Sequence, residues 1–367
     1  RGSAAAGCMQ HTGEGGLSRH HLHGSDLVFQ IDTAYFGCRD ARGRFDLGAL
    51  TALTQAHPIR AIEVKLSQGA KPGVGALLPA AKVTPEIAAA RGVPAGVDCH
   101  SPAAHTAFHD VPTLMEFIER VAEATGLPVG IKSAVGEEGF WEELAARMAR
   151  EGTGPDHIAI DGGEGGTGAG PLVFTDHVAL PFRLGLGRVY PVLAEAGVAD
   201  RVVVIGAGKL GLPENALLAF AMGCDMVSVG REAMMAVGCI QAQRCHTGRC
   251  PTGVATQSPW LQRGLIPERA SERLASYVAG LRAELLRLAR ACGVPHPALV
   301  ACDRIELLDG EDTVTAAERF GYRPGWGLPG EADRAALLAL MDELARRRPE
   351  AEPQTIPTRP GEAPHVP

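Results

Sequence analysis

The stretch that decides the fold is HIAIDGGEGGTGAGP, which runs from His157 to Pro171. Its first part, His157–Asp161, is a short apolar run with the length of a buried strand. Its second part, Asp161–Pro171, is a loop in which six of eleven residues are glycine. Backbone N–H groups in such a loop can converge on an anion, because no side chains stand in the way. The stretch therefore indicates a strand that leads into a phosphate-binding or flavin-binding loop.

Similar apolar runs recur along the chain and alternate with helical patterns. The further strand candidates are Leu27–Ile31, Ala61–Leu66, Pro128–Lys132, Arg201–Gly206 and Asp225–Gly230, with a weaker one at Cys8–Thr12. Apolar residues at helical spacing mark Val111–Thr125, Phe140–Arg150 and Pro213–Met222. Strands that alternate with helices predict a parallel sheet with helices outside it.

The glycines again follow the strands in the second half of the chain. Gly206–Gly211 (GAGKLG) and Gly230–Arg231 each come at the end of a strand candidate. A (β/α)8 barrel builds its active site from such loops and holds phosphate after its last two strands. We therefore predict a (β/α)8 TIM barrel, whose missing first strand lies upstream of Arg1. The alternative is an open doubly wound sheet, for which six or seven strands are enough.

The pattern changes after the barrel region. We expect the barrel in residues 1–260 and a helical extension in 261–345, which includes a long apolar-striped helix at Glu268–Ala291. Residues 346–367 are rich in proline and charge, so we expect a disordered tail.

Charge and cysteine usage exclude several classes of function. With 35 Lys and Arg against 42 Asp and Glu, the net charge is −7, and no basic stripe indicates a nucleic-acid partner. No apolar run reaches the roughly 18 residues of a membrane span. The cysteines are nine in number, and six of them are scattered singly, which argues for a reducing compartment. We expect a cytoplasmic protein.

Two lysines follow or end strand candidates. Lys132 ends the apolar run PVGIK, and a lysine that points into a barrel mouth needs an anionic partner or ligand. Lys71 lies in the Gly/Pro-rich loop KLSQGAKPGVGALLP (Lys65–Pro79), where a packing role does not fit. An exposed loop lysine is ordinarily only solvated, so this second residue is a candidate on position alone.

Three cysteines lie close together in GCIQAQRCHTGRCPTGVATQ (Gly238–Gln257), at Cys239, Cys245 and Cys250. Zinc sites bring their ligands in closer pairs and need four, so His246 or a distant cysteine would have to complete one. Three thiolates with proline beside the last suit a [3Fe–4S] cluster, because iron–sulfur centres are held by cysteine thiolates. The remaining alternative is that the three thiols bind no metal.

Seven stretches in order resemble the FMN-binding domain of glutamate synthase, most closely its stand-alone FMN proteins. The resemblance spans roughly residues 8–260. The matching stretches are GEGG (Gly13–Gly16), QGAKPG (Gln68–Gly73), LPAAKVTPEIAAARGVPAG (Leu78–Gly96), SPAAH (Ser101–His105), the strand lysine Lys132, DGGEGGTGAGP (Asp161–Pro171) and CIQAQRCHTGRCPTGVATQ (Cys239–Gln257).

The resemblance implies a barrel with FMN at the carboxyl ends of its strands and a [3Fe–4S] cluster on Cys239, Cys245 and Cys250. It places Gln68 and Lys132 against the flavin, with the lysine neutralising the N1/O2 region. It assigns the phosphate end to Gly163, Gly165, Gly166, Thr167, Gly208, Gly230 and Arg231. It assigns the substrate to Lys71, Glu14 and Arg91, where the lysine polarises or protonates the imine and the arginine pairs with a carboxylate.

The implied reaction belongs to nitrogen metabolism. Electrons pass from the cluster to FMN, and hydride then reduces 2-iminoglutarate, formed from 2-oxoglutarate and ammonia, to L-glutamate. These residues carry no amidotransferase sequence, so ammonia would arrive free or from a separate amidotransferase subunit. The expected electron donor is a ferredoxin or an NAD(P)H-dependent flavoprotein.

One loop departs from the family pattern. Glutamate synthase reads KPGEGGQLP where this chain reads KPGVGALLP, so Val74 replaces a carboxylate and Leu77 replaces an amide. Two alternatives to glutamate synthesis follow. One is a flavin subunit that makes an N-substituted glutamate by acting on a related imine. The other is a non-catalytic subunit that relays electrons to a partner.

Overall fold

The computed structural model describes residues 1–168, 170–171 and 173–347. Their contacts divide them into two units, Arg1–Pro329 and a second that begins at Gly330. The first unit holds the sheet, and in the second the described part is one helix, α12 (Glu331–Arg347). No helix of the described chain has the length and apolar character that crossing a membrane requires.

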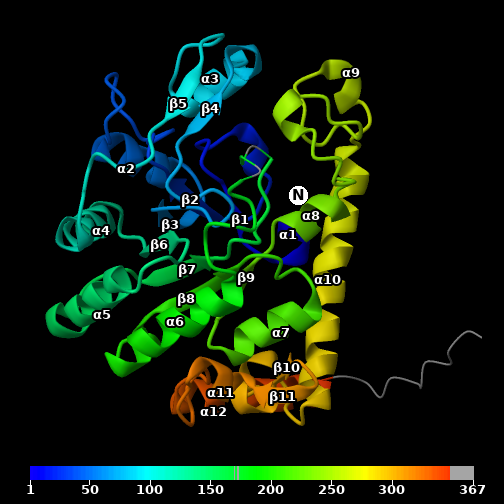
Figure 1. Ribbon diagram of the computed structural model, residues 1–367. Helices are drawn as coiled ribbons and strands as arrows, with labels where there is room; N and C mark the ends of the chain where they lie inside the picture. Colours follow the sequence, from blue (N-terminus) through cyan, green and yellow to red (C-terminus); the bar gives the residue numbers. More distant parts are fainter. Residues whose placement is uncertain (169, 172, 348–367) are drawn as a thin grey trace, which may run out of the picture. The chain divides into compact units, whose positions relative to one another are not determined.

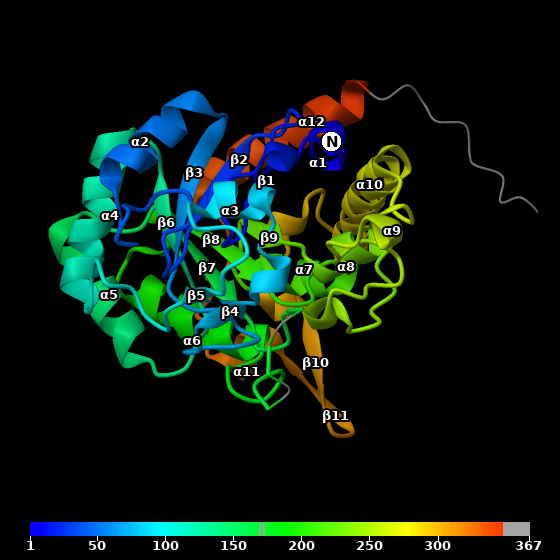
Figure 2. The same ribbon diagram turned by 90° about the horizontal axis from the view of Figure 1, so that it is seen from above.

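A curved sheet of seven parallel strands forms the centre of the first unit (Figures 1 and 2). Its strands are β1 (Gln10–His11), β2 (Leu27–Ile31), β3 (Ile59–Lys65), β6 (Val129–Ser133), β7 (His157–Asp161), β8 (Val203–Ala207) and β9 (Met226–Ser228). Their spatial order follows the chain without reversal. That order is the one of a (β/α)8 barrel, whereas a doubly wound sheet reverses at a switch point.

The sheet confirms every strand predicted from the sequence, including the weak candidate that became β1. Among the described residues, no strand pairs with the outer edge of β1 or of β9. The central strands were predictable because they are buried on both faces, as parallel strands flanked by helices are. Leu27, Phe29 and Ile31 of β2, for example, have no exposed surface.

Helices that follow the strands along the chain cover the outside of the sheet, as Figure 2 shows. They are α2 (Leu47–Ala56), α4 (Val111–Thr125), α5 (Gly139–Glu151), α6 (Phe182–Glu195), α7 (Pro213–Ala221) and α8 (Arg231–Ala236). The bounds of α4 match the prediction because strong signals mark both of its ends. Asp110 caps the first turn by accepting from the Thr113 backbone N–H, and Gly126 ends the helix at a φ of 67°.

Two segments interrupt the alternation of strands and helices. Between β3 and α4 the chain forms the antiparallel pair β4 (Ala76–Leu78) and β5 (Cys99–Ser101), with α3 (Pro85–Arg91) between them. Figure 1 shows this segment at one end of the sheet. The other is the cysteine segment after α8, which leads through α9 (Pro259–Gln262) to α10 (Pro267–Ala291).

The extension after residue 260 is mainly helical, with one difference from the prediction. The long helix α10 lies against α1 (Gly2–Ala6) and α7. It is followed by a hairpin of β10 (Glu306–Asp309) and β11 (Asp312–Thr315), which the sequence analysis does not predict, and by α11 (Ala316–Phe320). The domain boundary at residue 260 stays a prediction.

The predicted disordered tail begins too early. Arg346 and Arg347 belong to the last turn of α12, where basic side chains suit the helix dipole. The rest of that predicted tail, residues 348–367, lies outside the described residues.

Candidate functional site

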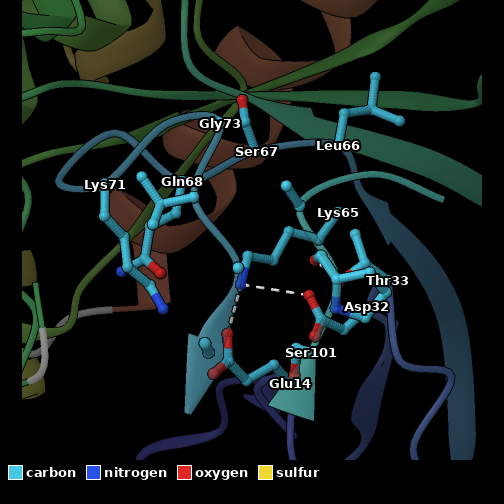
Figure 3. A pocket seen from close by; sticks show the side chains of 15 residues that line it. Glu14, Asp32, Thr33, Lys65, Leu66, Ser67, Gln68, Lys71, Gly73 and Ser101 are labelled. Atoms are coloured by element: carbon cyan, nitrogen blue, oxygen red, sulfur yellow. Dashed lines mark hydrogen bonds and ion pairs between the residues drawn. The ribbon is translucent and has the colours of Figure 1, made fainter.

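A pocket lies where β3 ends and the QGAKPG loop begins (Figure 3). It encloses about 340 Å³ of empty space, part of it open to solvent. Its polar lining comes from Glu14, Asp32, Thr33, Lys65, Ser67, Gln68, Lys71 and Ser101. Its apolar lining includes Leu66, Val74, Ala76, Pro102 and Ala103. The pocket thus gathers segments that follow β1, β2 and β3, together with the end of β5.

Lys65 is the centre of the polar side of this pocket. Its ammonium group contacts the carboxylate of Glu14 and lies 3.3 Å from Asp32 Oδ1, as the dashed lines in Figure 3 show. Both Lys65 and Asp32 are buried. Burial raises the pKa of Glu14, but the neighbouring Lys65 lowers it, and the net shift is downward. Glu14 is therefore ionised at neutral pH.

Lys71 has a different environment although it lines the same pocket. It is buried, and its ammonium group has no hydrogen-bonding or ion-pair partner among the described residues. Its charge acts on Glu14, whose pKa it helps to lower. A buried cation without a carboxylate partner is costly unless a ligand supplies one. Lys71 is therefore well placed to receive an anionic or carbonyl group.

Arg91 does not line the pocket. Its guanidinium group lies over the ring of Phe36, 4.5 Å from the centroid, and Nη1 donates to Cys99 Sγ at 3.7 Å. A Cβ atom added at Gly15 would lie 3.5 Å from Nη2, so the arginine borders the GEGG loop. Of the three predicted substrate residues, the structure brings Glu14 and Lys71 into the pocket and leaves Arg91 beside it.

A second buried network surrounds Lys132 on β6. Its Nζ donates to Gln30 Oε1 at 2.8 Å and lies 3.2 Å from Glu63 Oε1. The same Glu63 oxygen receives His11 Nε2 at 2.9 Å. Burial lowers the pKa of Lys132, but Glu63 and then Asp161 raise it, and the net shift is upward. Lys132 is therefore a cation at neutral pH, as its predicted role requires.

Asp161 connects the strand β7 to the QGAKPG loop. Its Oδ2 accepts the backbone N–H of Gly69 at 3.1 Å. A Cβ atom added at Gly69 would lie 2.0 Å from the carbonyl oxygen of Gly162, so only glycine fits there. Burial raises the pKa of Asp161 despite the nearby Lys132. The loop that carries Gln68 and Lys71 is thus anchored to the start of the glycine-rich loop.

The glycine-rich loops after β7, β8 and β9 meet at the same end of the sheet. Arg231 Nη2 donates to the Glu164 carbonyl oxygen at 3.2 Å and also borders Gly166. Gly208 has a φ of 126°, and a Cβ atom on it would lie 3.3 Å from Gly162 Cα. The Glu164 carboxylate accepts from the backbone N–H of Phe182, the first residue of α6. The predicted phosphate residues therefore form one cluster.

These loops have the properties of an anion cradle. Cβ atoms added at Gly163 and Gly165 would lie 2.5 Å and 3.0 Å from the carbonyl oxygens of Ala179 and Gly162. Glycine is therefore needed for the close packing of the loop backbone at these positions, and Arg231 supplies positive charge beside the loop, where its side chain borders Gly166. Gly230 precedes Arg231 at the start of α8, and Thr167 and Gly168 close the β7 loop. This donor set fits the phosphate end of a flavin nucleotide.

The three clustered cysteines occupy three different local structures. Cys239 follows α8 and its Sγ accepts the backbone N–H of Gln241 at 3.3 Å. Cys245 begins a single 3₁₀ turn (Cys245–Thr247), and Cys250 is buried. Burial raises the pKa of Cys250, but hydrogen bonds from Thr252 and from backbone groups lower it to about 7. This thiol therefore yields the thiolate that metal binding needs.

The three cysteines do not converge on one point in the described structure. Among the described residues, no group of three His, Cys, Asp or Glu side chains lies close enough to hold one ion. An iron–sulfur cluster spreads its thiolates over several irons, so it is not tested by this observation. The segment does approach the glycine-rich loop, since a Cβ atom added at Gly168 would lie 2.8 Å from Cys245 Cβ.

Comparison with known proteins identifies the family. The model of the conserved region in glutamate synthase matches residues 1–295. This chain belongs to the glutamate synthase family. It is 40% identical over 294 residues to the glutamate synthase large subunit-like protein YerD of Bacillus subtilis, covering 80% of this chain and 56% of that protein.

A second relative comes from an archaeon. The archaeal glutamate synthase (NADPH) of Methanocaldococcus jannaschii is 35% identical over 291 residues, covering 78% of this chain and 54% of that protein. The chain thus spans about half the length of these relatives. Family membership confirms the resemblance found in the sequence. The activity of the full-length relatives is not assigned to this chain on similarity alone.

Several residues of this family member's site were missed by sequence reasoning. They are His11, Gln30, Asp32, Glu63 and Lys65. The available signal was the alternation of side chains along strands: Glu63 and Lys65 lie two apart in the apolar run AIEVKL, so both point to one face. Charged residues inside otherwise apolar strands need partners, and those partners lie on other strands.

Proposed function

We propose that this chain is the flavin-binding catalytic region of a glutamate synthase-type oxidoreductase, of EC class 1.4. The observation that carries the proposal is that three groups of residues follow or end strands of the sheet. They are the pocket with Lys71 after β3, the buried cation Lys132 on β6, and the glycine-rich loops with Arg231 after β7 to β9. This arrangement supports a substrate site, a flavin ring site and a phosphate site at the carboxyl ends of the strands.

The residues that would hold FMN are those of the two networks described above. Gln68 and Lys132 would contact the ring. Gly163, Gly165, Gly166, Thr167, Gly208, Gly230 and Arg231 would surround its phosphate end. FMN, when bound, supplies hydride transfer, and the protein supplies orientation and charge. Lys132 would favour negative charge at the N1/O2 edge of the ring.

In the pocket, the chain's own residues suit an imine derived from a 2-oxo acid. The substrate of this proposal is 2-iminoglutarate, formed from 2-oxoglutarate and ammonia and reduced to L-glutamate. Lys71 would polarise the imine or give it a proton, because its ammonium group has no competing acceptor in the described structure. Glu14 is already paired with Lys65 and would orient the nitrogen end. Arg91 would pair with a carboxylate at the rim.

We also propose the [3Fe–4S] cluster on Cys239, Cys245 and Cys250. Two observations support it: the lowered pKa of Cys250 and the contact between Cys245 and the Gly168 end of the flavin loop. Such a cluster supplies one-electron transfer. The proposed electron donor is a ferredoxin or an NAD(P)H-dependent flavoprotein, and the proposed ammonia source is an amidotransferase subunit.

One pocket residue favours a second candidate, a flavin subunit that makes an N-substituted glutamate. Val74 lines the pocket and is 37% exposed, where the family pattern has a carboxylate. An apolar side chain at this position offers no hydrogen bond and tolerates an apolar substituent. The imine would then come from a primary amine such as methylamine instead of ammonia.

Spectra and reoxidation test the proposal. Protein purified without oxygen should show a flavin absorption band and a broad iron–sulfur shoulder. Absence of both would refute the proposed function. The reduced protein is then mixed with 2-oxoglutarate and either ammonia or methylamine. Faster reoxidation with ammonia supports glutamate synthesis, and faster reoxidation with methylamine supports the second candidate. Reoxidation only by a partner protein indicates the relay role instead.

A cysteine variant separates the two cofactors. Cys245→Ser should lose iron and keep a full complement of FMN, because the glycine cradle and Lys132 are untouched. The matched control is Cys292→Ser, because Cys292 follows the last turn of α10 and is not part of the cysteine segment. This variant should keep both iron and FMN. Iron retained at wild-type stoichiometry in Cys245→Ser would refute the cluster assignment.

A further inference from the structure

The carboxylate of Glu63 connects three strands inside the sheet. Glu63 lies on β3 and is only 4% exposed. Its Oε1 lies 3.2 Å from Lys132 Nζ on β6 and 2.9 Å from His11 Nε2 on β1. Gly130, in register with Glu63, has no room for a side chain, since an added Cβ would lie 2.2 Å from the His157 ring. The carboxylate is therefore held from two sides, by Lys132 and by His11.

The hydrogen bonds of His11 determine its tautomer. Its Nδ1 accepts the backbone N–H of Gly13 at 3.0 Å, so Nδ1 carries no proton. Nε2 must then carry the proton and donate it to Glu63. Gly13 immediately precedes Glu14, the residue that enters the pocket. His11 thus links the buried carboxylate to the turn that presents Glu14.

One of the three N–H groups of the Lys132 ammonium has no partner among the described contacts. An ammonium group has three N–H bonds, and the described contacts use two of them, to Gln30 and Glu63. The third is available to a ligand. Burial raises the pKa of Glu63, yet Lys132 and His11 lower it further than burial raises it, so the carboxylate is ionised. The positive charge that Lys132 offers to a ligand is therefore partly cancelled by a fixed negative charge.

We propose that Glu63 and His11 are positioning residues of the flavin site. Glu63 holds Lys132 and reduces the positive charge that the flavin experiences, and His11 ties the same carboxylate to the backbone before Glu14. The inference rests on the proposed function, because it takes Lys132 as the flavin contact. Its consequence is that the flavin midpoint potential is set in part by a carboxylate that does not touch the flavin.

Glu63→Gln tests the charge without removing the hydrogen bonds. The amide oxygen can accept from both Lys132 and His11, so the packing stays and the negative charge goes. With less negative charge beside it, the cation should stabilise the reduced flavin about tenfold over the oxidised flavin, which raises the two-electron midpoint potential by about 30 mV. Lys132→Met should lower the potential, and the exposed Glu143→Gln on α5 should leave it unchanged.

The outcomes separate this inference from the proposed function. Wild-type protein without FMN would overturn the proposed function. Wild-type protein with FMN, and an unchanged or lower potential in folded Glu63→Gln, would overturn the role of Glu63 alone. The role of His11 is tested separately, by nitrogen NMR of wild-type protein with 15N-labelled histidine. The His11 signals are assigned by their loss in His11→Gln, so this test does not depend on the folding of Glu63→Gln. A proton on Nε2 and none on Nδ1 supports the tie to Gly13, and a proton on Nδ1 overturns it.

Discussion

Lys65 on β3 and Asp32, which follows β2, form an ion pair inside the protein, with 3.3 Å between Nζ and Oδ1. Both side chains are less than a tenth exposed, and Glu14 contacts the same ammonium group. Two carboxylates thus share one cation at the floor of the pocket. Removing the cation would leave the buried carboxyl group of Asp32 without this ion-pair partner, which is far more costly than losing a surface pair.

Lys65→Met should therefore destabilise the protein strongly. We expect the free energy of unfolding to fall by about 3–5 kcal/mol in urea titrations, the range for breaking a buried pair. Arg147→Met removes a partly exposed cation that pairs with Glu143 and Glu151 on α5 and should cost much less, because solvent screens such surface pairs. Equal losses in the two variants would contradict the buried pair.

The Glu14–Lys65 contact also predicts a pH dependence. Folding lowers the pKa of Glu14 below its usual 4.5, so the unfolded chain binds more protons between the two values. The contact's stabilisation is present above pH 4.5 and is lost as pH falls through the folded pKa. Glu14→Gln should accordingly be less stable than wild type at pH 6, and the difference should shrink by pH 3. A difference that grows toward low pH would reverse the sign of this argument.

The strands and α4 could be predicted from the sequence because local signals decide them. Helix α6 was missed for a physical reason: it contains Gly185, Gly187 and Pro191, which lower helix propensity. Tertiary packing outweighs that propensity, since Gly187 leaves room for the Phe320 ring, which an added Cβ would approach to 2.4 Å. Long-range contacts of this kind leave no pattern in a single sequence.

The site was predictable only where residues gather in one loop. The cysteine segment and the β7 loop of the glycine cradle are each continuous in the chain, and the cradle's other two loops were recognised because glycines follow β8 and β9 directly. The buried networks join residues far apart in sequence: His11 and Glu63 are 52 positions apart, and Gln30 and Lys132 are 102 apart. The alternation along β3 shows that Glu63 faces inward, but only the strand register shows which groups it meets.

The lowered pKa of Cys250 predicts its reactivity in protein freed of iron. Iodoacetamide should label Cys250 at a rate that reaches half its maximum near pH 7, because the thiolate is the nucleophile. Thr252→Val removes the side-chain hydrogen bond that Sγ makes at 3.5 Å and should move this midpoint upward. Thr247→Val, in the same segment but without contact to Cys250, should leave it in place. A wild-type midpoint near pH 9 would contradict the prediction. Labelling is read by mass spectrometry of the peptide that contains Cys250.

The contact between Gly168 and Cys245 predicts that the flavin loop and the cysteine segment are positioned together. In Gly168→Ala the new methyl group would meet Cys245 Cβ at 2.8 Å and Sγ at 3.4 Å, so the cysteine must move. The iron content should fall well below wild type, whereas FMN content should fall less, because the contacts of the new methyl group within 4 Å are with Cys245 and not with Lys132 or Arg231. Gly136→Ala, where an added Cβ meets nothing within 4 Å, is the matched control and should keep both cofactors. Full iron occupancy in folded Gly168→Ala would show that Cys245 is not held against this loop when the cofactors are bound.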